Sequence, residues 1–194
     1  KLARLMIWGA PGIGKTAILM KVLEAMQKDF PDYRLITKTL SNETPDNFTL
    51  PKYVEIDGVD YFFVSQQEFK ENVEKGNLLE YAKFVGNYYG TPKDKVDEAL
   101  AQGKDIVLEI EVQGALLVKE KCPNALLVFV APPSWEELEK RLVNRGTDSM
   151  EKIQARLKQA KSEIEKIENY DYIIVNDVLE TAISEVISII ATQD

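Results

Sequence analysis

The sequence contains no histidine and only one cysteine, Cys122, among 194 residues. The missing histidines exclude a catalytic triad of the Ser-His type, an imidazole general base and a histidine metal site. A single thiol excludes an intrachain disulfide and a thiolate zinc cluster, and it fits a reducing compartment. Basic residues are also in deficit, because 24 Lys and Arg face 32 Asp and Glu, a net charge of −8. Such a chain is a poor binder of nucleic-acid backbones, so we predict no nucleic-acid partner.

Long apolar runs are absent as well. No uninterrupted apolar stretch approaches the ~20 residues that a helix needs to span a bilayer, and no signal peptide is visible. We therefore predict no membrane partner and a cytoplasmic location. What the sequence does contain, 45% hydrophobic and 29% charged residues, is typical of one large globular domain.

Short apolar runs alternate along the chain with segments of helical periodicity. Strands are predicted over 5–8, 33–37, 61–64, 106–110, 126–130 and 172–175. Helices are predicted from the glycine-rich turn at 9–14 to Phe30-Pro31, from Ser65, over 92–102, from Ser134 to 146, over 149–168 and over 178–191. Residues 38–55 lack a pattern and are predicted to form a loop. The alternation predicts an α/β fold with a parallel sheet covered by helices on both faces.

Two of these helices have distinctive sequence signals at their starts, and a third has one along its length. Ser65-Gln-Gln-Glu68 and Ser134-Trp-Glu-Glu137 both match the capping box, in which each end of the pattern satisfies a backbone N–H of the first turn. The helix predicted over 149–168 is amphipathic, and its apolar stripe comprises Ile153, Leu157, Ala160, Ile164 and Ile167.

The first glycine-rich turn matches the pattern G-x-x-x-x-G-K-[ST] at every fixed position. It lies between a predicted strand and a predicted helix, the context that this phosphate-binding loop requires. Its backbone N–H groups and the helix amino terminus attract phosphate oxygens, the lysine neutralises the β and γ phosphates, and the hydroxyl ligates Mg²⁺. We therefore predict a site for a nucleoside triphosphate and Mg²⁺, formed by Gly9, Ala10, Pro11, Gly12, Ile13, Gly14, Lys15 and Thr16.

From Asp57 onward the chain resembles the guanylate kinases, the nucleoside monophosphate kinases that phosphorylate GMP from ATP. With the phosphate loop, the matching segments cover nearly the whole chain in the family's order and spacing. They are Asp57-Gly-Val-Asp-Tyr-Phe-Phe-Val-Ser65, Leu79-Glu-Tyr-Ala82, Gly86-Asn-Tyr-Tyr-Gly-Thr-Pro92, Gln113-Gly-Ala115, Ala131-Pro-Pro-Ser134, Arg145-Gly-Thr-Asp148 and Ile174-Val-Asn-Asp177.

The resemblance implies a single guanylate-kinase-like domain over 1–194, built on a P-loop parallel sheet. Its core would comprise 1–32, 93–140 and 169–194. A small mixed subdomain that binds the nucleoside monophosphate (NMP) would be inserted at 33–92. A helical lid would run over 141–157 and lead into the long helix to 168.

On the donor side, the resemblance implies three arginines that close on the triphosphate, Arg141, Arg145 and Arg156, and an adenine shelf near Asn176. Arg141 and Arg145 lie four residues apart, so one helix face carries both. Cations that arrive when a lid closes stabilise the charge of the transferring phosphoryl group. The alternative is a solvated charged face.

On the acceptor side, the resemblance implies that Glu80 accepts hydrogen bonds from guanine, whose N1–H and exocyclic amine are both donors. Thr91 would touch the same base, and the hydroxyls of Tyr61 and Tyr89 would bind the acceptor phosphate. Tyr88 and Phe84, in the same aromatic-rich stretch, are predicted to be core residues.

Glu109 and Glu111 follow an apolar strand, where an acidic residue can hold the shell of a Mg²⁺ ion. The family has aspartates at both places, so each side chain here is one methylene longer. Glu109 is the predicted metal contact, together with Thr16, and both glutamates are predicted to face the substrate. The alternative is that they are polar residues at the end of a strand.

The family's acceptor-phosphate segment, Thr-Thr-Arg-x-Pro-Arg, is not present here. Counting back from Glu55 places Lys52 on one of its arginines, whereas Asn42 takes the place of the other. Lys38 is a candidate substitute. Lysine offers a point charge where arginine offers a two-bond fork, so a weaker or rebuilt phosphate contact is expected.

Three interpretations follow from this departure. We predict an ATP-dependent kinase for GMP or dGMP, with ATP and Mg²⁺ at the donor side and a monomeric or homodimeric state. The alternatives are a kinase for a different NMP acceptor and a catalytically weak interaction module, like the guanylate-kinase-like domains of scaffold proteins. Those domains often lack a working phosphate loop, so the intact loop favours an enzyme.

Overall fold

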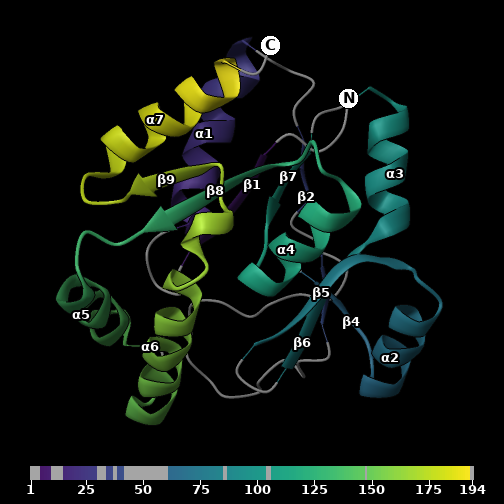
Figure 1. Cartoon of the computed structure of the whole chain (residues 1–194), viewed down its shortest axis with the longest axis horizontal. Helices are drawn as coiled ribbons and strands as arrows, with labels where there is room; N and C mark the ends of the chain where they lie inside the picture. Colours follow the sequence, from purple (N-terminus) through teal and green to yellow (C-terminus); the bar gives the residue numbers. More distant parts are fainter. Residues whose placement is uncertain are drawn as a thin grey trace.

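Two β-sheets organise the chain (Figure 1). The computed structural model describes residues 5–9, 15–29, 34–36, 39–41, 61–84, 87–103, 106–146 and 148–192. Five strands form the main sheet: β1 (Leu5–Gly9), β2 (Arg34–Ile36), β7 (Ile106–Glu109), β8 (Leu126–Ala131) and β9 (Tyr172–Val175). Their order is β2-β7-β1-β8-β9, and every neighbouring pair is parallel. The predicted parallel α/β sheet is therefore confirmed.

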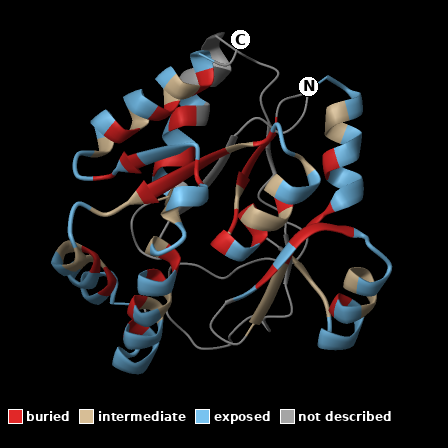
Figure 2. Cartoon of the chain, in the orientation of Figure 1, coloured by how far each residue is buried: buried red, intermediate tan, exposed pale blue. Residues whose placement is uncertain are grey.

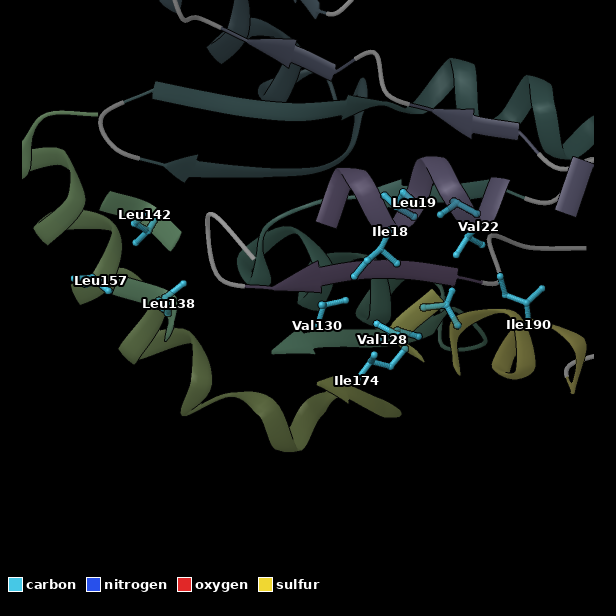
Figure 3. Close-up of a cluster of buried hydrophobic side chains, with 14 of the residues drawn as sticks. Ile18, Leu19, Val22, Val128, Val130, Leu138, Leu142, Leu157, Ile174 and Ile190 are labelled. Atoms are coloured by element: carbon cyan, nitrogen blue, oxygen red, sulfur yellow. The ribbon is translucent and has the colours of Figure 1, made fainter. Parts of the chain in front are cut away.

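Helices cover both faces of the main sheet, because the side chains of its strands alternate between two cores. On one face, Val107, Val128 and Val130 pack against α1 (Lys15–Asp29) and α7 (Leu179–Ala191). Residues from α5 (Trp135–Arg145) and α6 (Met150–Ile164) complete this core (Figure 3). On the other face, Ile106, Leu108, Leu127 and Phe129 pack against α3 (Lys93–Ala101) and α4 (Val112–Lys121). Figure 2 shows these buried strands between helices whose outer surfaces are exposed.

The second sheet is mixed and has the strand order β4-β3-β6-β5. Its strands are β3 (Thr39–Ser41), β4 (Tyr61–Phe63), β5 (Leu78–Phe84) and β6 (Asn87–Pro92). β3 and β4 are parallel, whereas β6 runs antiparallel to both β3 and β5. Helix α2 (Gln66–Glu74) belongs to this part of the chain and buries Phe69.

The loop predicted over 38–55 is wrong at β3. A strand of three residues has too little sequence for a visible alternation, and its backbone is satisfied by neighbours on both sides, β4 and β6. β2 pairs with β7 in the main sheet although the predicted NMP subdomain begins at residue 33, so the second sheet starts at β3. The division into core, subdomain and lid is otherwise untested and stays a prediction.

The helix starts follow the predicted caps. Ser65 and Glu68 form a complete capping box at α2. At α5 (Trp135–Arg145) the box is half made: the Ser134 hydroxyl accepts from the Glu137 N–H, but the Glu137 carboxylate binds Arg141 instead. Gly146 ends α5 with φ 66°, a left-handed conformation that glycine adopts without strain.

One helix prediction needs correction, and one helix was missed. The helix predicted over 149–168 is α6 (Met150–Ile164), which ends earlier and is followed by a 3-10 turn, η1 (Ile167–Asn169). Helix α4 was not predicted at all, because it has no side-chain cap and carries a glycine in its first turn. It is nevertheless central, since it contacts β5 of the second sheet as well as β1 and β8 of the main sheet. Among the described residues, no helix has the length and apolarity to cross a membrane.

Candidate active site

The base-reading residues predicted on the acceptor side meet on neighbouring strands. Glu80 lies in β5 directly opposite Thr91 in β6, next to an irregularity in the strand register at Leu78/Glu80. The Thr91 hydroxyl donates a hydrogen bond of 2.6 Å to Glu80 Oε1. Both residues are buried, with 3% of Glu80 and 0% of Thr91 exposed. A buried carboxylate whose described partner is a neutral hydroxyl keeps capacity to accept further hydrogen bonds.

Helix α4 lies against this carboxylate. Lys121 Nζ, at the end of α4, donates to the carbonyl oxygens of Leu79 at 2.6 Å and Leu78 at 3.4 Å, and so holds β5 to the helix. Burial raises the pKa of Glu80 to about 7, against the hydrogen bonds from Thr91; Glu111 raises it further and Lys121 lowers it. The raised pKa of Glu80 thus marks a buried carboxylate that is more basic than an exposed one.

The residues predicted to bind the acceptor phosphate are partly described. Tyr89 is half-buried in β6, where its backbone pairs with Ala82 and Ser41. Tyr61 begins β4, but its side chain is not among the described ones. Lys52 and Lys38 lie entirely outside the described residues. Tyr88, predicted to be a core residue, is only half-buried, although its ring packs 5.5 Å from that of the buried Phe69. The Phe84 side chain lies outside the described part.

On the donor side, the structure describes the two ends of the phosphate loop. Gly9 ends β1 and Lys15 begins α1, as the strand–loop–helix pattern predicts, while residues 10–14 lie outside the described part. Lys15 Nζ lies 3.7 Å from Oε1 of Glu111, the residue that precedes α4. Both side chains are largely buried, so this ion pair is only weakly screened by solvent.

Glu163 joins this cluster and was missed by the sequence reasoning. It lies on α6 with 5% of its surface exposed, and Gln159 Nε2 donates to its Oε1 at 2.8 Å. Burial and the nearby Glu111 raise the pKa of Glu163, whereas Lys15 lowers it. Burial, Glu163 and Glu111 together raise the pKa of the Tyr170 hydroxyl. The sequence signal that could have revealed Glu163 was its position three residues after Ala160, on the buried stripe of the helix, where a charged residue is unexpected.

The predicted metal contacts lie on adjoining elements. Glu109 is the half-buried last residue of β7, in register with Ile7 of β1, the strand that leads into the phosphate loop. Thr16 is the second residue of α1, and its side chain is not described. Among the described residues, no group of three or more acidic or cysteine side chains gathers as a metal site. One carboxylate and one hydroxyl suit Mg²⁺, which keeps several waters and binds substrate phosphates.

The three predicted lid arginines lie on α5 and α6, at one end of the main sheet (Figure 1). Arg141 Nε binds Glu137 Oε1 at 2.8 Å, and its Nη1 donates to the backbone oxygen of Asn176 at 2.8 Å. Arg145 is exposed at the last residue of α5. Arg156 Nε lies 3.1 Å from Asp148 Oδ2.

Asn176, the predicted adenine shelf, is 6% exposed and follows β9 directly. Its N–H donates to the carbonyl of Ala131 at the end of β8. Arg141 therefore links α5 to the carboxyl edge of the parallel sheet, the edge at which open α/β sheets bind their ligands.

Comparisons with known proteins point to one family. The model of the family "Guanylate kinase" matches residues 2–193. A guanylate kinase of Thermus thermophilus is 46% identical over 185 residues, which are 95% of this chain and 79% of that protein. The guanylate kinase of Lactococcus lactis subsp. lactis is also 46% identical, over 95% of this chain and 85% of that protein. The crystal structure of guanylate kinase from Anaplasma phagocytophilum superposes with a TM-score of 0.74 at 26% identity, covering 99% of this chain and 86% of that one.

Proposed function

This chain belongs to the guanylate kinase family, and we propose that its residues divide phosphoryl transfer between a donor half and an acceptor half. The enzyme catalyses the ATP-dependent phosphorylation of GMP to GDP. In that reaction an oxygen of the GMP phosphate bonds to the γ-phosphorus while the bond to ADP breaks. We extend the acceptor to dGMP, since the predicted contacts read the base and the phosphate. The observation that carries the acceptor assignment is the buried Glu80–Thr91 pair.

In the proposed acceptor half, the ionised Glu80 carboxylate accepts hydrogen bonds from the N1–H and the exocyclic amine of guanine. Thr91 orients the carboxylate and lies beside the same base. Adenine has an acceptor at N1, which would face the carboxylate without a hydrogen bond. Tyr61, Tyr89 and Lys52 are proposed to bind the acceptor phosphate, with Lys52 in the place of an arginine of the family.

In the proposed donor half, the loop from Gly9 to Thr16 surrounds the ATP phosphates and Lys15 neutralises them. Glu111, 3.7 Å from Lys15, orients the ammonium group before the phosphates bind. Asn176 supports the adenine at the end of β9. Thr16 and Glu109 would hold a Mg²⁺ ion, which when bound supplies charge neutralisation at the phosphates.

The proposed lid action depends on exchange of partners. Arg141 and Arg156 both lie against carboxylates, Glu137 and Asp148. Phosphate oxygens carry more charge than a carboxylate, so we propose that closure brings these arginines and Arg145 onto the triphosphate. Catalysis would then come from positioning and charge stabilisation rather than from a protein acid or base.

Two alternatives lose support. Similarity to curated guanylate kinases over nearly the whole chain favours an enzyme over an interaction module, and it favours GMP over another acceptor. We further propose a cytoplasmic location, which suits both nucleotide substrates and a single cysteine, and a monomeric or homodimeric state.

A coupled assay of ADP formation tests the proposal across GMP, dGMP, AMP, CMP and UMP, with ATP and Mg²⁺ present. We expect GMP and dGMP to be the best acceptors by at least ~100-fold in kcat/KM, because a mismatched base leaves buried polar groups unpaired. A higher kcat/KM for a pyrimidine or for AMP would contradict the assignment of the acceptor half.

A further inference from the structure

The first turn of α4 passes directly beneath the carboxylate of Glu80. The residue at this crossing is Gly114, the third residue of the helix, and it is buried. A side-chain Cβ built on Gly114 would overlap Glu80 Oε2 and would lie 2.8 Å from Glu80 Cδ and 3.4 Å from its Cγ. The carboxylate therefore occupies the space that any side chain at position 114 would need.

The surrounding structure keeps the helix and the strand at this separation. Lys121 donates to the carbonyls of Leu78 and Leu79, which fixes β5 against the far end of α4. In β5, Glu80 is in register with Thr91, whose side chain is fully buried. The atom nearest to a new Cβ is the end of the Glu80 side chain rather than backbone. A methyl group at position 114 would therefore move the carboxylate and leave the two backbones in place.

Glycine at this position is unfavourable for the helix itself. It loses more backbone entropy on folding than alanine, and it is among the poorest helix formers. The φ of Gly114 is not in the positive range that would require glycine, so the backbone does not explain it. What does require a residue without a side chain is the carboxylate above it.

We propose that Gly114 is a specificity-determining residue that sets where the Glu80 carboxylate meets the guanine edge. The inference rests on the base-reading role proposed for Glu80. Gly114 acts through Glu80 and touches no reacting atom, so it is a positioning residue. Two guanine donors need both the position and the angle of the carboxylate, whereas hypoxanthine, which lacks the exocyclic amine, offers one donor only. Displacing the carboxylate should thus harm GMP more than inosine monophosphate.

The test is a double-mutant cycle of Gly114→Ala with Glu80→Asp, assayed for kcat/KM with GMP and with inosine monophosphate. Gly114→Ala should lower kcat/KM for GMP at least ~10-fold, lower it less for inosine monophosphate, and leave the KM for ATP unchanged. The variant should still fold cooperatively, because the atoms that must move belong to the end of a side chain rather than to backbone, and a thermal melt checks this. Glu120→Ala, at an exposed site on the same helix, is the matched control and should leave kcat/KM unchanged for both acceptors.

In the Glu80→Asp background, Gly114→Ala should cost clearly less than in the wild type, because the shorter side chain leaves room for the methyl group. Equal losses in both backgrounds, or an unchanged ratio of GMP to inosine monophosphate, would overturn the inference. If Gly114→Ala alone does not fold, the double variant is compared with Glu80→Asp alone. A ~10-fold lower kcat/KM for GMP in the double variant would contradict the proposal. Glu80→Gln separates the two proposals. If Glu80→Gln leaves kcat/KM for GMP unchanged, the base-reading role of Glu80 is contradicted. If Glu80→Gln lowers it but Gly114→Ala does not, only the inference about Gly114 is contradicted.

Discussion

The two halves of the site use their glutamates in opposite ways. In the donor half, Glu111 lies 3.7 Å from the ammonium group of Lys15, so charge faces charge. In the acceptor half, Glu80 is buried against a hydroxyl and a glycine, and its pKa rises to about 7. We propose that the first arrangement holds a cation in place for phosphates. The second, in the same proposal, keeps a strong acceptor available for a base, and it places a carboxylate where water cannot solvate it.

The largest loss of activity is expected from a substitution of Lys15 in the donor half. Lys15→Ala removes the cation of the phosphate loop, and we expect kcat to fall at least ~1000-fold in the coupled assay. Lys21→Ala is the matched control on the same helix, because its ion pair with Glu24 is exposed and contributes little. Wild-type-like turnover of Lys15→Ala would remove the phosphate-loop assignment.

The acceptor half is next tested at its phosphate end. Lys52→Ala should raise the KM for GMP by ~10- to 100-fold with little effect on the KM for ATP, since one charge-assisted hydrogen bond is lost. Lys52→Arg should be neutral or should improve acceptor use, because a fork restores a second bond.

If Lys52→Ala leaves the KM for GMP unchanged, either Lys38 binds the acceptor phosphate or no lysine of this segment does. The Lys38→Ala variant separates these outcomes. If both variants are silent and GMP turnover is barely detectable, the interaction module becomes the better interpretation of the chain.

The pH dependence sharpens the contrast between the two glutamates. Since Glu80 must be ionised for both of its oxygens to accept from the two guanine donors, kcat/KM for GMP should rise with pH through about 7 and be ~10-fold lower at pH 6 than at its plateau. Glu80→Gln should lack this component and retain only the titration of the GMP phosphate. Superimposable profiles for the two proteins would mean that Glu80 stays ionised throughout, or that it does not read the base.

The smallest expected effect concerns stability and distinguishes Gly90 from Gly114, the two glycines near Glu80. A Cβ on Gly90 would lie 2.8 Å from Leu78 Cδ1, 3.0 Å from the Glu80 backbone oxygen and 3.3 Å from Phe69 Cζ. Because a backbone atom is among these neighbours, Gly90→Ala should destabilise the fold by about 1–3 kcal/mol. Chemical denaturation measures this loss, and unchanged stability would show that the second sheet yields more easily than its packing suggests.

The sequence predicted the strand and the helix that flank the glycine loop, because their signals are local. The glycine loop, its strand and its helix occupy one continuous segment, and the alternation of strands and helices predicted the parallel sheet. The family resemblance brought Glu80 and Thr91 to the same base, and the structure brings them into direct contact.

What the sequence missed depends on contacts between distant segments. Helix α4 has a weak start, and its glycine makes sense only with β5 above it. The hairpin β5–β6 and the short strand β3 are stabilised by pairing rather than by their own pattern. Glu163 lies beside Lys15 and Glu111 only because α6 returns to the sheet, which no spacing along the chain reveals.

The most direct measurement is calorimetric titration of GMP and, separately, of ATP into the wild type and Glu80→Gln. The substitution keeps the shape of the side chain and turns one acceptor oxygen into a donor, which then faces a donor of guanine. We expect GMP to bind at least ~10-fold more weakly to the variant while ATP binds equally well to both proteins. Unchanged GMP affinity would show that Glu80 does not touch the base, and an equal loss for ATP would mean that the substitution damages the fold rather than the acceptor half.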